Sequence, residues 1–521
     1  MRQFEEPCRT VQECFTRHAR YIPDKLALVC GEERLSWLQL NEGMVKVANG
    51  LTAIGIKKGD RVCFLMPIMT KTVEIMYGIT KAGAAMVPLS GMVQPETLAL
   101  IINDCDAQAI FVGPGMDALI EPIRAQINIP EKNFIAVGFE KEGWLPFESF
   151  LSGVSSIEKW IKADFDDPWL ILYTSGTTGE PKGSLFTAHG RYLWTLNCAI
   201  GYHFNETSST LISTSLYTAA SQLVMQPTLL AGGTVILLAQ FDVAEWMKLA
   251  ERERPTHTLL VPTQYYMLLA HPDIDKYDMS HFQVMTSVGA PLLPDSKKEI
   301  IKRFGPVFME MYGLSEGVST ILAPEDVLRK PSSVGIPPAG QEIRIIDNQG
   351  NECPNGEVGE IVGYGPEMLH CYYNKPEINA ESIWVDEIGR TFLRTGDVGK
   401  LDEENYLYIL DRKKDMIISG GSNIYAADIE VIIFKHPEVA DCAVIGVPSD
   451  KWGESPRALV VLKEGCSSSE QEMREWINER VAKYQRVDAV EIRPVLPRNP
   501  LGKMLKRQLR EPYWEKVGLK K

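Results

Sequence analysis

Residues 173–183 have the sequence YTSGTTGEPKG and directly continue an apolar run, residues 169–173 (WLILY), that is typical of a buried strand. The segment holds three glycines, four serine or threonine hydroxyls and one lysine within eleven residues. Glycine lets backbone N–H groups approach phosphate oxygens, and hydroxyls add further donors. Lys182 adds a charge that can follow a departing pyrophosphate. The segment therefore predicts a phosphate-binding loop; it is not a Walker A loop, because Pro181 stands where the second Walker glycine belongs.

The apolar runs around this loop predict layered α/β structure. Short runs bounded by glycine or proline alternate with helix-like stretches, which is typical of buried parallel strands between layers of helices. The runs are residues 61–67, 85–89, 109–112, 133–137, 169–173, 234–238, 258–261 and 283–287.

The sequence pattern changes at about Gly335. From there on, the expected strands are shorter, as at residues 342–346, and turn-forming residues follow one another at closer spacing. This pattern predicts a small antiparallel sheet or barrel. The charged run at residues 411–415 (DRKKD) then separates two apolar strands, and a mixture of strands and helices follows. We predict two domains, residues 1–411 and 412–521. The predicted fold class is α/β, with layered α/β subdomains and a small β-barrel-like subdomain in the large first domain and a small α+β second domain.

Composition excludes several classes of protein. A length of 521 residues exceeds what one core normally organises. A net charge of -14 without a long Lys/Arg block argues against nucleic-acid binding. The ten cysteines contain no C-x-x-C pair or metal-like spacing, which favours reduced thiols in a cytoplasmic protein. The N-terminus, with Glu5 and Glu6, is unlike a signal peptide, and no apolar run reaches the length of a membrane span.

Further motifs follow the loop in a fixed order. They are residues 287–292 (SVGAPL), 311–316 (MYGLSE), 392–397 (FLRTGD), 411–415 (DRKKD) and 499–503 (NPLGK). With the loop, they make nearly the whole chain resemble the acyl-adenylate-forming superfamily, which includes acyl-CoA synthetases, luciferases and nonribosomal adenylation domains.

The resemblance implies an AMP-forming acid–thiol ligase of the fatty-acid or aryl-acid CoA ligase kind. A carboxylic acid and ATP would give an acyl-adenylate and pyrophosphate with the help of Mg²⁺, and coenzyme A would then take the acyl group. Carboxylate attack on a phosphate brings anions together, so the site must supply positive charge that gains value in the transition state. Three alternatives stay open. They are a luciferase-like enzyme, a free-standing adenylation enzyme that loads a carrier protein, and a non-catalytic nucleotide-binding paralogue, which is disfavoured because the charged residues of the motifs are all present.

The resemblance also implies roles for individual residues. Lys503, Lys182 and Glu316 are the expected catalytic residues, with Lys503 bridging the substrate carboxylate and the α-phosphate region. Glu316 and Thr174 are expected to hold Mg²⁺, because this hard cation prefers oxygen ligands. The expected nucleotide- and coenzyme-binding residues are Thr174, Ser175, Gly176, Thr177, Thr178, Gly179, Lys182, Gly289, Ala290, Pro291, Met311, Tyr312, Gly313, Ser315, Asp397, Arg412, Gly420 and Gly421.

The acid itself is expected to contact a pocket formed by residues from several motifs. They are Trp194, Tyr217, Thr218, Val288, Gly313, Val318 and Ser319. Related ligases often have an aromatic residue followed by His where this chain has Tyr217 and Thr218. Thr218 cannot act as a titratable gate or an aromatic wall, so either Tyr217 takes that role or the pocket is more open here. Small residues leave room for a bulky acid, and fatty, aryl, bile-acid-like and betaine-type carboxylates all stay open.

The resemblance further implies a mobile C-terminal domain that rotates about a hinge at Lys414. Residues 419–423 (SGGSN) would then swing toward the adenylate, with Gly420 and Gly421 lining a narrow tunnel for the pantetheine arm. Coenzyme A is favoured over a carrier protein, because no carrier-domain serine motif follows the ligase. Dimers are common among relatives, so a homodimer is a further expectation.

Overall fold

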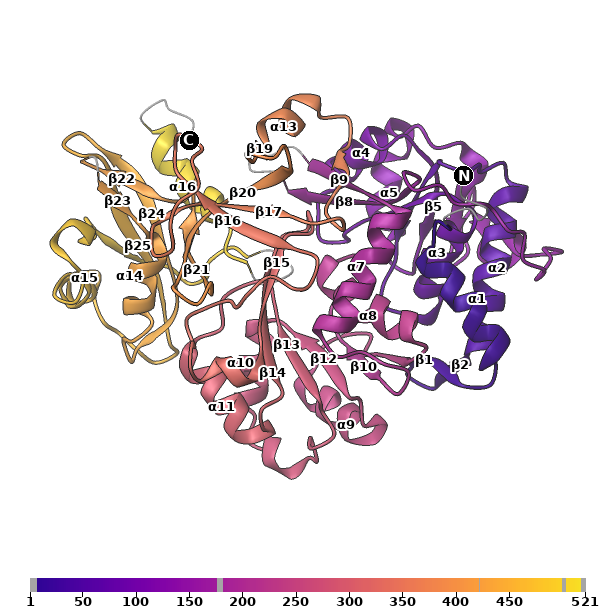
Figure 1. The fold of residues 1–521 in the computed structure, drawn as a ribbon, viewed down its shortest axis with the longest axis horizontal. Helices are drawn as coiled ribbons and strands as arrows, with labels where there is room; N and C mark the ends of the chain where they lie inside the picture. The colour runs from indigo at the N-terminus through magenta and orange to yellow at the C-terminus, as the bar shows by residue number, and fades with distance from the viewer. Residues whose placement is uncertain (1–6, 176–180, 421, 499–502, 517–521) are drawn as a thin grey trace. The chain divides into compact units, whose positions relative to one another are not determined.

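The computed structural model describes residues 7–175, 181–420, 422–498 and 503–516 (Figure 1). The contacts within the chain divide it into two compact units, each with its own sheets and buried core. The first unit consists of Met1–Pro331, Pro337–Glu342 and Tyr364–Ile383. The second unit consists of Ser332–Ile336, Ile343–Gly363 and Trp384–Lys521.

The first sheet of the first unit has a parallel centre and an antiparallel strand at each edge. All residues of two central strands, β12 (His257–Leu260) and β13 (Val284–Ser287), are buried, as expected for parallel strands that are covered on both faces. In spatial order its eight strands are β15 (Ser319–Leu322), β14 (Phe308–Gly313), β13 (Val284–Ser287), β12 (His257–Leu260), β10 (Ser209–Ile212), β11 (Thr234–Leu237), β1 (Leu26–Cys30) and β2 (Glu33–Ser36).

The second sheet of the first unit carries the predicted phosphate loop. In spatial order its eight strands are β18 (Cys371–Tyr372), β9 (Pro181–Thr187), β8 (Pro168–Ser175), β4 (Ala85–Pro88), β3 (Arg61–Leu65), β5 (Ala107–Val112), β6 (Phe134–Ala136) and β7 (Leu145–Pro146). Strands β8 and β9 are antiparallel, with Tyr173 opposite Gly183 and Thr174 opposite Lys182. The loop therefore joins the two strands of a β-hairpin.

Helices pack against the strands of both sheets of the first unit. They are α1 (Val11–Tyr21), α2 (Trp37–Ala53), α3 (Thr70–Lys81), α4 (Pro95–Asp104), α5 (Asp117–Ile120), α6 (Phe147–Phe150), α7 (Ala188–Gly201), α8 (Ala219–Ala231), α9 (Val243–Glu253), α10 (Pro262–Ala270), α11 (Pro294–Phe304), α12 (Pro324–Val327) and α13 (Pro376–Glu381), with 3-10 turns at Glu121–Gln126, Glu131–Asn133 and Ile274–Lys276. Helix α2 begins with a capping box in which Ser36 and Gln39 satisfy each other's backbone N–H groups. Helices α7 and α8 pack against each other, as do α2 and α3 (Figure 1).

The second unit contains two further five-stranded sheets. The first has the order β16 (Glu342–Ile346), β17 (Gly359–Tyr364), β20 (Thr391–Leu401) and β19 (Ile383–Val385), with β21 (Leu407–Arg412) also pairing with β20. The second has the order β23 (Ser422–Ile424), β22 (Ile417–Ser419), β25 (Gly453–Leu462) and β24 (Val439–Ser449), with β26 (Val490–Ile492) also pairing with β25.

The helices of the second unit are α14 (Ala426–Ile433), α15 (Glu470–Asn478) and α16 (Lys506–Glu515), with a 3-10 turn at Lys483–Gln485. Helix α14 contributes Ile429 and Ile433, and α15 contributes Met473 and Ile477, to one buried core with the strands. The four-residue spacing places each pair on one face of its helix, which is why these segments fold onto the sheet.

The predicted fold class is confirmed, because layered α/β sheets, a small sheet of short strands and a C-terminal α+β part all follow in the expected order. One detail differs from the expectation, since the charged run begins inside a strand. Asp411 and Arg412 end β21, where they lie opposite Val398 and Asp397 of β20. The predicted boundary between residues 411 and 412 separates the large domain from the part expected to rotate, and it stays a prediction.

No helix among the described residues combines the length and the apolar character that crossing a membrane requires.

Candidate active site

The phosphate-loop hairpin is tightly packed at its base. A side chain at Gly183 would lie 2.7 Å from Ile171 and 2.9 Å from the ring of Tyr173, so only glycine fits beneath that ring. Strand pairing places Lys182 directly opposite Thr174. Gly176, Thr177, Thr178, Gly179 and the side chain of Ser175 lie outside the described residues.

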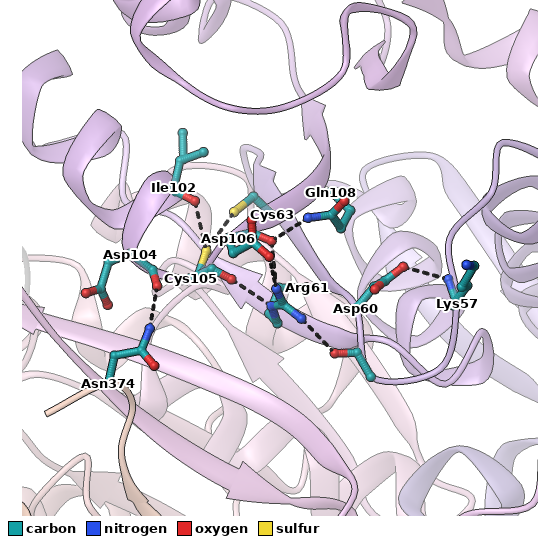
Figure 2. Close-up of polar contacts among 11 residues, drawn as sticks. Lys57, Asp60, Arg61, Cys63, Ile102, Asp104, Cys105, Asp106, Gln108 and Asn374 are labelled. Atoms are coloured by element: carbon teal, nitrogen blue, oxygen red, sulfur yellow. Dashed lines mark hydrogen bonds and ion pairs between the residues drawn. The ribbon is translucent and has the colours of Figure 1, made fainter. Parts of the chain in front are cut away.

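Tyr173 ties the start of the loop to helix α4. Its hydroxyl donates a hydrogen bond to Asp104 Oδ2 at 2.5 Å, and burial raises the pKa of the phenol. Figure 2 shows how the end of this helix is held: Arg61 donates to the carbonyl oxygens of Cys105 and Asp106 at 2.7 and 3.0 Å. An arginine that binds the last carbonyls of a helix stabilises its C-terminus. Asp104 is therefore a fixed acceptor for Tyr173.

Glu316 is held in place by two hydroxyl donors. Ser315 Oγ donates to Oε2 at 2.7 Å, and the Tyr372 hydroxyl donates to Oε1 at 3.0 Å. A carboxylate has about four acceptor sites, so each oxygen can still accept a ligand. Mg²⁺ commonly uses one or two carboxylates together with substrate phosphates. Glu316, with both oxygens oriented by hydroxyl groups, fits the role of such a carboxylate ligand.

Tyr372 is a residue of this site that the sequence did not indicate. Lys182 Nζ lies 5.8 Å from the centre of its ring, within the range of a cation–π interaction. Because its hydroxyl contacts Glu316, the residue links two groups that lie far apart in the chain. Strand β18 is only two residues long and shows no periodicity, so no local signal could have identified it.

The motifs at residues 287–292 and 311–316 begin in the last residues of two neighbouring parallel strands, in which Ser287 of β13 lies opposite Glu310 of β14. Ligands of α/β proteins often bind at the carboxyl ends of such strands. Glu310 accepts a hydrogen bond from the N–H of Leu292 at 3.1 Å and forms a buried ion pair with Lys297. This contact fixes the loop that contains Gly289, Ala290 and Pro291 to the strand that ends with Met311, Tyr312 and Gly313.

Packing against neighbouring residues requires a glycine at position 313, whether or not a substrate also uses the space. A side chain there would lie 2.6 Å from Met311 Cε and 3.2 Å from the carbonyl oxygen of Val318. Val318 is fully buried, and the backbone N–H of Ser319 donates to Gln341 Oε1 at 2.8 Å. Their place in the acid pocket stays a prediction.

The other predicted pocket residues lie on or near α7 and α8. Trp194 of α7 is 6% exposed, and the guanidinium carbon of Arg191 lies 3.6 Å from the centre of one of its rings. The hydroxyl of Tyr217 is buried without a hydrogen-bond partner among the described residues. Thr218 is the N-cap of α8, where its hydroxyl accepts from the N–H of Ser221 at 3.2 Å. Helix capping thus occupies the Thr218 hydroxyl and leaves Tyr217 as the residue with an unsatisfied polar group.

In the second unit, Asp397 and Arg412 meet across β20 and β21. Arg412 Nε lies 3.1 Å from Asp397 Oδ1, and Asp397 is 3% exposed. Lys414 lies in the turn that follows β21, and its carbonyl oxygen accepts a hydrogen bond from Arg510 of α16 at 2.8 Å. The structure thus brings together two residues that the sequence named separately, and their predicted binding of ribose stays a prediction.

Gly420 of the second unit lies at a tight turn. Gly420 has φ +57°, and a side chain there would lie 2.8 Å from the indole of Trp452, so glycine is required. Gly421 lies outside the described residues. An isolated antiparallel bridge joins Arg498 to Met504, which places the half-buried Lys503 directly beside the bridge.

A glycine-rich hairpin carrying a lysine, linked through an aromatic ring to a carboxylate, on a layered α/β fold, fits an enzyme that acts on a nucleotide. A family model described as AMP-binding enzyme matches residues 15–373, and one described as AMP-binding enzyme C-terminal domain matches residues 428–503. The chain belongs to this family of AMP-binding enzymes.

The alignments with related proteins cover most of this chain and most of each relative. A feruloyl-CoA synthase of Amycolatopsis sp is 33% identical over 503 residues, with 95% of this chain and 98% of the relative covered. A long-chain-fatty-acid–CoA ligase of Mycobacterium tuberculosis is 33% identical over 485 residues, with 92% and 93% covered. The crystal structure of ATP-bound MatB from Rhodopseudomonas palustris superposes with a TM-score of 0.87 at 30% identity, covering 97% of this chain and 99% of that one.

Proposed function

We propose that this enzyme is an AMP-forming acid–thiol ligase that converts a carboxylic acid, ATP and coenzyme A to acyl-CoA, AMP and pyrophosphate. The family and the relatives support the reaction class. The observation that carries the proposal is the contact chain from Lys182 through Tyr372 to Glu316, beside the glycine-rich hairpin. This arrangement supplies a cation and a metal-binding carboxylate where phosphates would bind.

For the adenylation step we propose a role for each of the candidate residues. Lys182 and the loop N–H groups would bind the pyrophosphate portion of ATP, and Asp397 with Arg412 would bind the ribose. Mg²⁺, when bound by Glu316 with help from Thr174, would neutralise phosphate charge. Lys503 would hold the substrate carboxylate against the α-phosphate, where a compact cation stabilises the charge of the transition state.

The thioester step would require Lys503 to withdraw and a thiol to approach. We propose that residues 412–521 rotate about Lys414 and that the backbone at Gly420 then borders the coenzyme A tunnel. The fixed geometry of Gly420 against Trp452 supports a backbone-lined surface at this position. Coenzyme A is proposed as the thiol because both relatives described above are named for it.

The acid is proposed to bind near Tyr217, because a buried hydroxyl without a partner favours a ligand or water that completes its hydrogen bond. A pyrophosphate-release screen over fatty, aryl, bile-acid-like and betaine-type acids, with coenzyme A present, would identify the preferred class. Replacing coenzyme A by a phosphopantetheinyl carrier protein in the same screen would test the acceptor.

The division of labour between the two steps can be tested with Lys503→Ala. We expect acid-dependent pyrophosphate exchange to be nearly abolished, while thioester formation from supplied acyl-AMP is largely retained. Lys516→Ala, which changes an exposed lysine of the same region, is the matched control. Equal loss of both half-reactions in folded Lys503→Ala would contradict the proposal. Lys414→Pro should spare adenylation and slow overall turnover, and unimpaired turnover would contradict the hinge.

A cytoplasmic location and a homodimer complete the proposal. All ten cysteines are free in the structure, which suits a reducing compartment. Sedimentation equilibrium would test the dimer, and cell fractionation would test the location.

A further inference from the structure

Residues 369–375, which we call the strap, run alongside strand β9 of the hairpin that carries the phosphate loop. Strand β18, in the middle of the strap, pairs with β9, and the N–H of Tyr373 donates to the carbonyl oxygen of Gly183 at 2.7 Å. At one end, the N–H of Leu369 donates to the carbonyl oxygen of Glu316 at 2.8 Å. The strap thus binds both the returning strand of the loop and the segment that carries Glu316.

The other end of the strap reaches the acceptor of Tyr173. Asn374 Nδ2 donates to the carbonyl oxygen of Asp104 at 3.1 Å, as Figure 2 shows, and Lys375 Nζ lies 3.6 Å from the Asp104 carboxylate. Tyr173, which begins the loop motif, donates to the same carboxylate. Both strands of the hairpin and the Glu316 segment are therefore joined through one short stretch of chain.

Tyr372 is the strap residue whose side chain lies between the charged groups. It is 8% exposed, and its backbone is fixed by Asn379, which accepts from its N–H at 2.7 Å and donates to its carbonyl oxygen at 3.0 Å. Its hydroxyl donates to Glu316 Oε1 at 3.0 Å, and Lys182 Nζ lies 5.8 Å from the centre of its ring.

We propose that Tyr372 is a positioning residue that fixes the Glu316 carboxylate and the Lys182 ammonium relative to each other, so that ATP binding becomes dependent on Mg²⁺. The inference rests on the proposed function. The hydroxyl orients one carboxylate oxygen while Ser315 orients the other, and the ring presents its electron-rich face to Lys182. A tyrosine that served packing alone would not need its hydroxyl on a carboxylate, because phenylalanine would fill the same space.

The test compares Tyr372→Phe, which removes only the hydroxyl, with Tyr372→Leu, which also removes the ring. Tyr202→Phe is the matched control, because it removes a buried hydroxyl that has no partner among the described residues. Calorimetry would measure ATP binding with Mg²⁺ and with a chelator, and thermal unfolding without ligand would confirm that each variant is folded. The Mg²⁺ concentration that gives half-maximal pyrophosphate exchange is the second readout.

For Tyr372→Phe we expect ATP binding without metal to be unchanged and the gain from Mg²⁺ to fall about tenfold, because a hydrogen bond to a charged group is lost. The half-saturating Mg²⁺ concentration should rise by about the same factor, with exchange largely restored at high Mg²⁺. Tyr372→Leu should also weaken binding without metal, because Lys182 loses its ring. In a Glu316→Gln background, Tyr372→Phe should have no further effect.

Equal loss with and without metal, or behaviour identical to Tyr202→Phe, would overturn the inference while leaving the ligase proposal intact. The ligase proposal fails separately if the unmodified protein binds ATP but no acid supports pyrophosphate exchange. If the unmodified protein does not bind ATP at all, both are wrong.

Discussion

Arg510 donates from Nη1 to the carbonyl oxygen of Lys414 at 2.8 Å and lies 3.3 Å from Asp415 Oδ1. Helix α16 is thereby attached to the turn that contains the predicted hinge. Arg510 is 7% exposed, so this contact is shielded from water. The turn and the C-terminal helix should therefore respond together to a change at either residue.

Arg510→Met should destabilise the second unit by about 2 kcal/mol, because a hydrogen bond from a charged donor is lost in a buried setting. Arg507→Met, three residues earlier on the same helix, should cost less than about 0.5 kcal/mol, because its pair with Glu511 is partly exposed. Thermal unfolding followed by circular dichroism would measure both. Equal losses in the two variants would show that the Lys414 contact contributes nothing.

Lys297→Met should destabilise the first unit by about 3–5 kcal/mol. The substitution leaves Glu310 buried without its cation, and burial already raises the pKa of that carboxyl. Lys298→Met is the control, because Lys298 pairs with Asp295 at the surface. Denaturant unfolding would measure the difference, and similar midpoints for the two variants would contradict the prediction.

Thr218→Ala should cost about 1 kcal/mol, because the hydroxyl caps α8, whereas Thr218→Ser should be nearly neutral. Thermal unfolding would measure the stability of each variant. The acid screen provides the second measurement: an altered acid preference in Thr218→Ser would mean that the threonine methyl group contacts the substrate.

The stability of the second unit should depend on the ionisation of Asp411. Burial raises the pKa of Asp411 to about 6, although Lys506 opposes the shift. The folded state then binds a proton more tightly than the unfolded state, so this carboxyl stabilises folding at low pH. The contribution, about 3 kcal/mol, is lost as the pH rises from about 4 to about 6.

Asp411→Asn should remove this part of the pH dependence. The variant keeps only one of the two side-chain oxygens that accept from the N–H groups of Arg412 and Ala426, so it should be less stable than the unmodified chain at pH 4. The difference should shrink or reverse toward pH 7. Melting temperatures measured at both pH values would check this, and a constant difference would contradict the assigned pKa.

The sequence alone predicted buried strands at its eight apolar runs and the position of the phosphate loop at the end of β8. These features can be predicted because they depend on local sequence. Apolar runs indicate that a segment is buried, and glycine-rich stretches indicate where its backbone can turn. The order of the motifs, read as a family resemblance, predicted the family to which the chain belongs. Asp397 and Arg412 were named as nucleotide-binding candidates from the sequence, and that role stays a prediction.

Only the tertiary structure showed that the loop belongs to a hairpin, that Thr218 caps a helix and that Gly313 is required by its neighbours. It also brought Tyr372 onto Glu316, although 56 residues separate them in the chain. Such contacts depend on how distant segments pack. The strand that contains Tyr372 has only two residues, so it has no sequence periodicity from which the contact could be predicted. The sequence thus determined the fold and the class of enzyme, while the packing of the strap against the hairpin decided how Lys182 and Glu316 are held relative to each other.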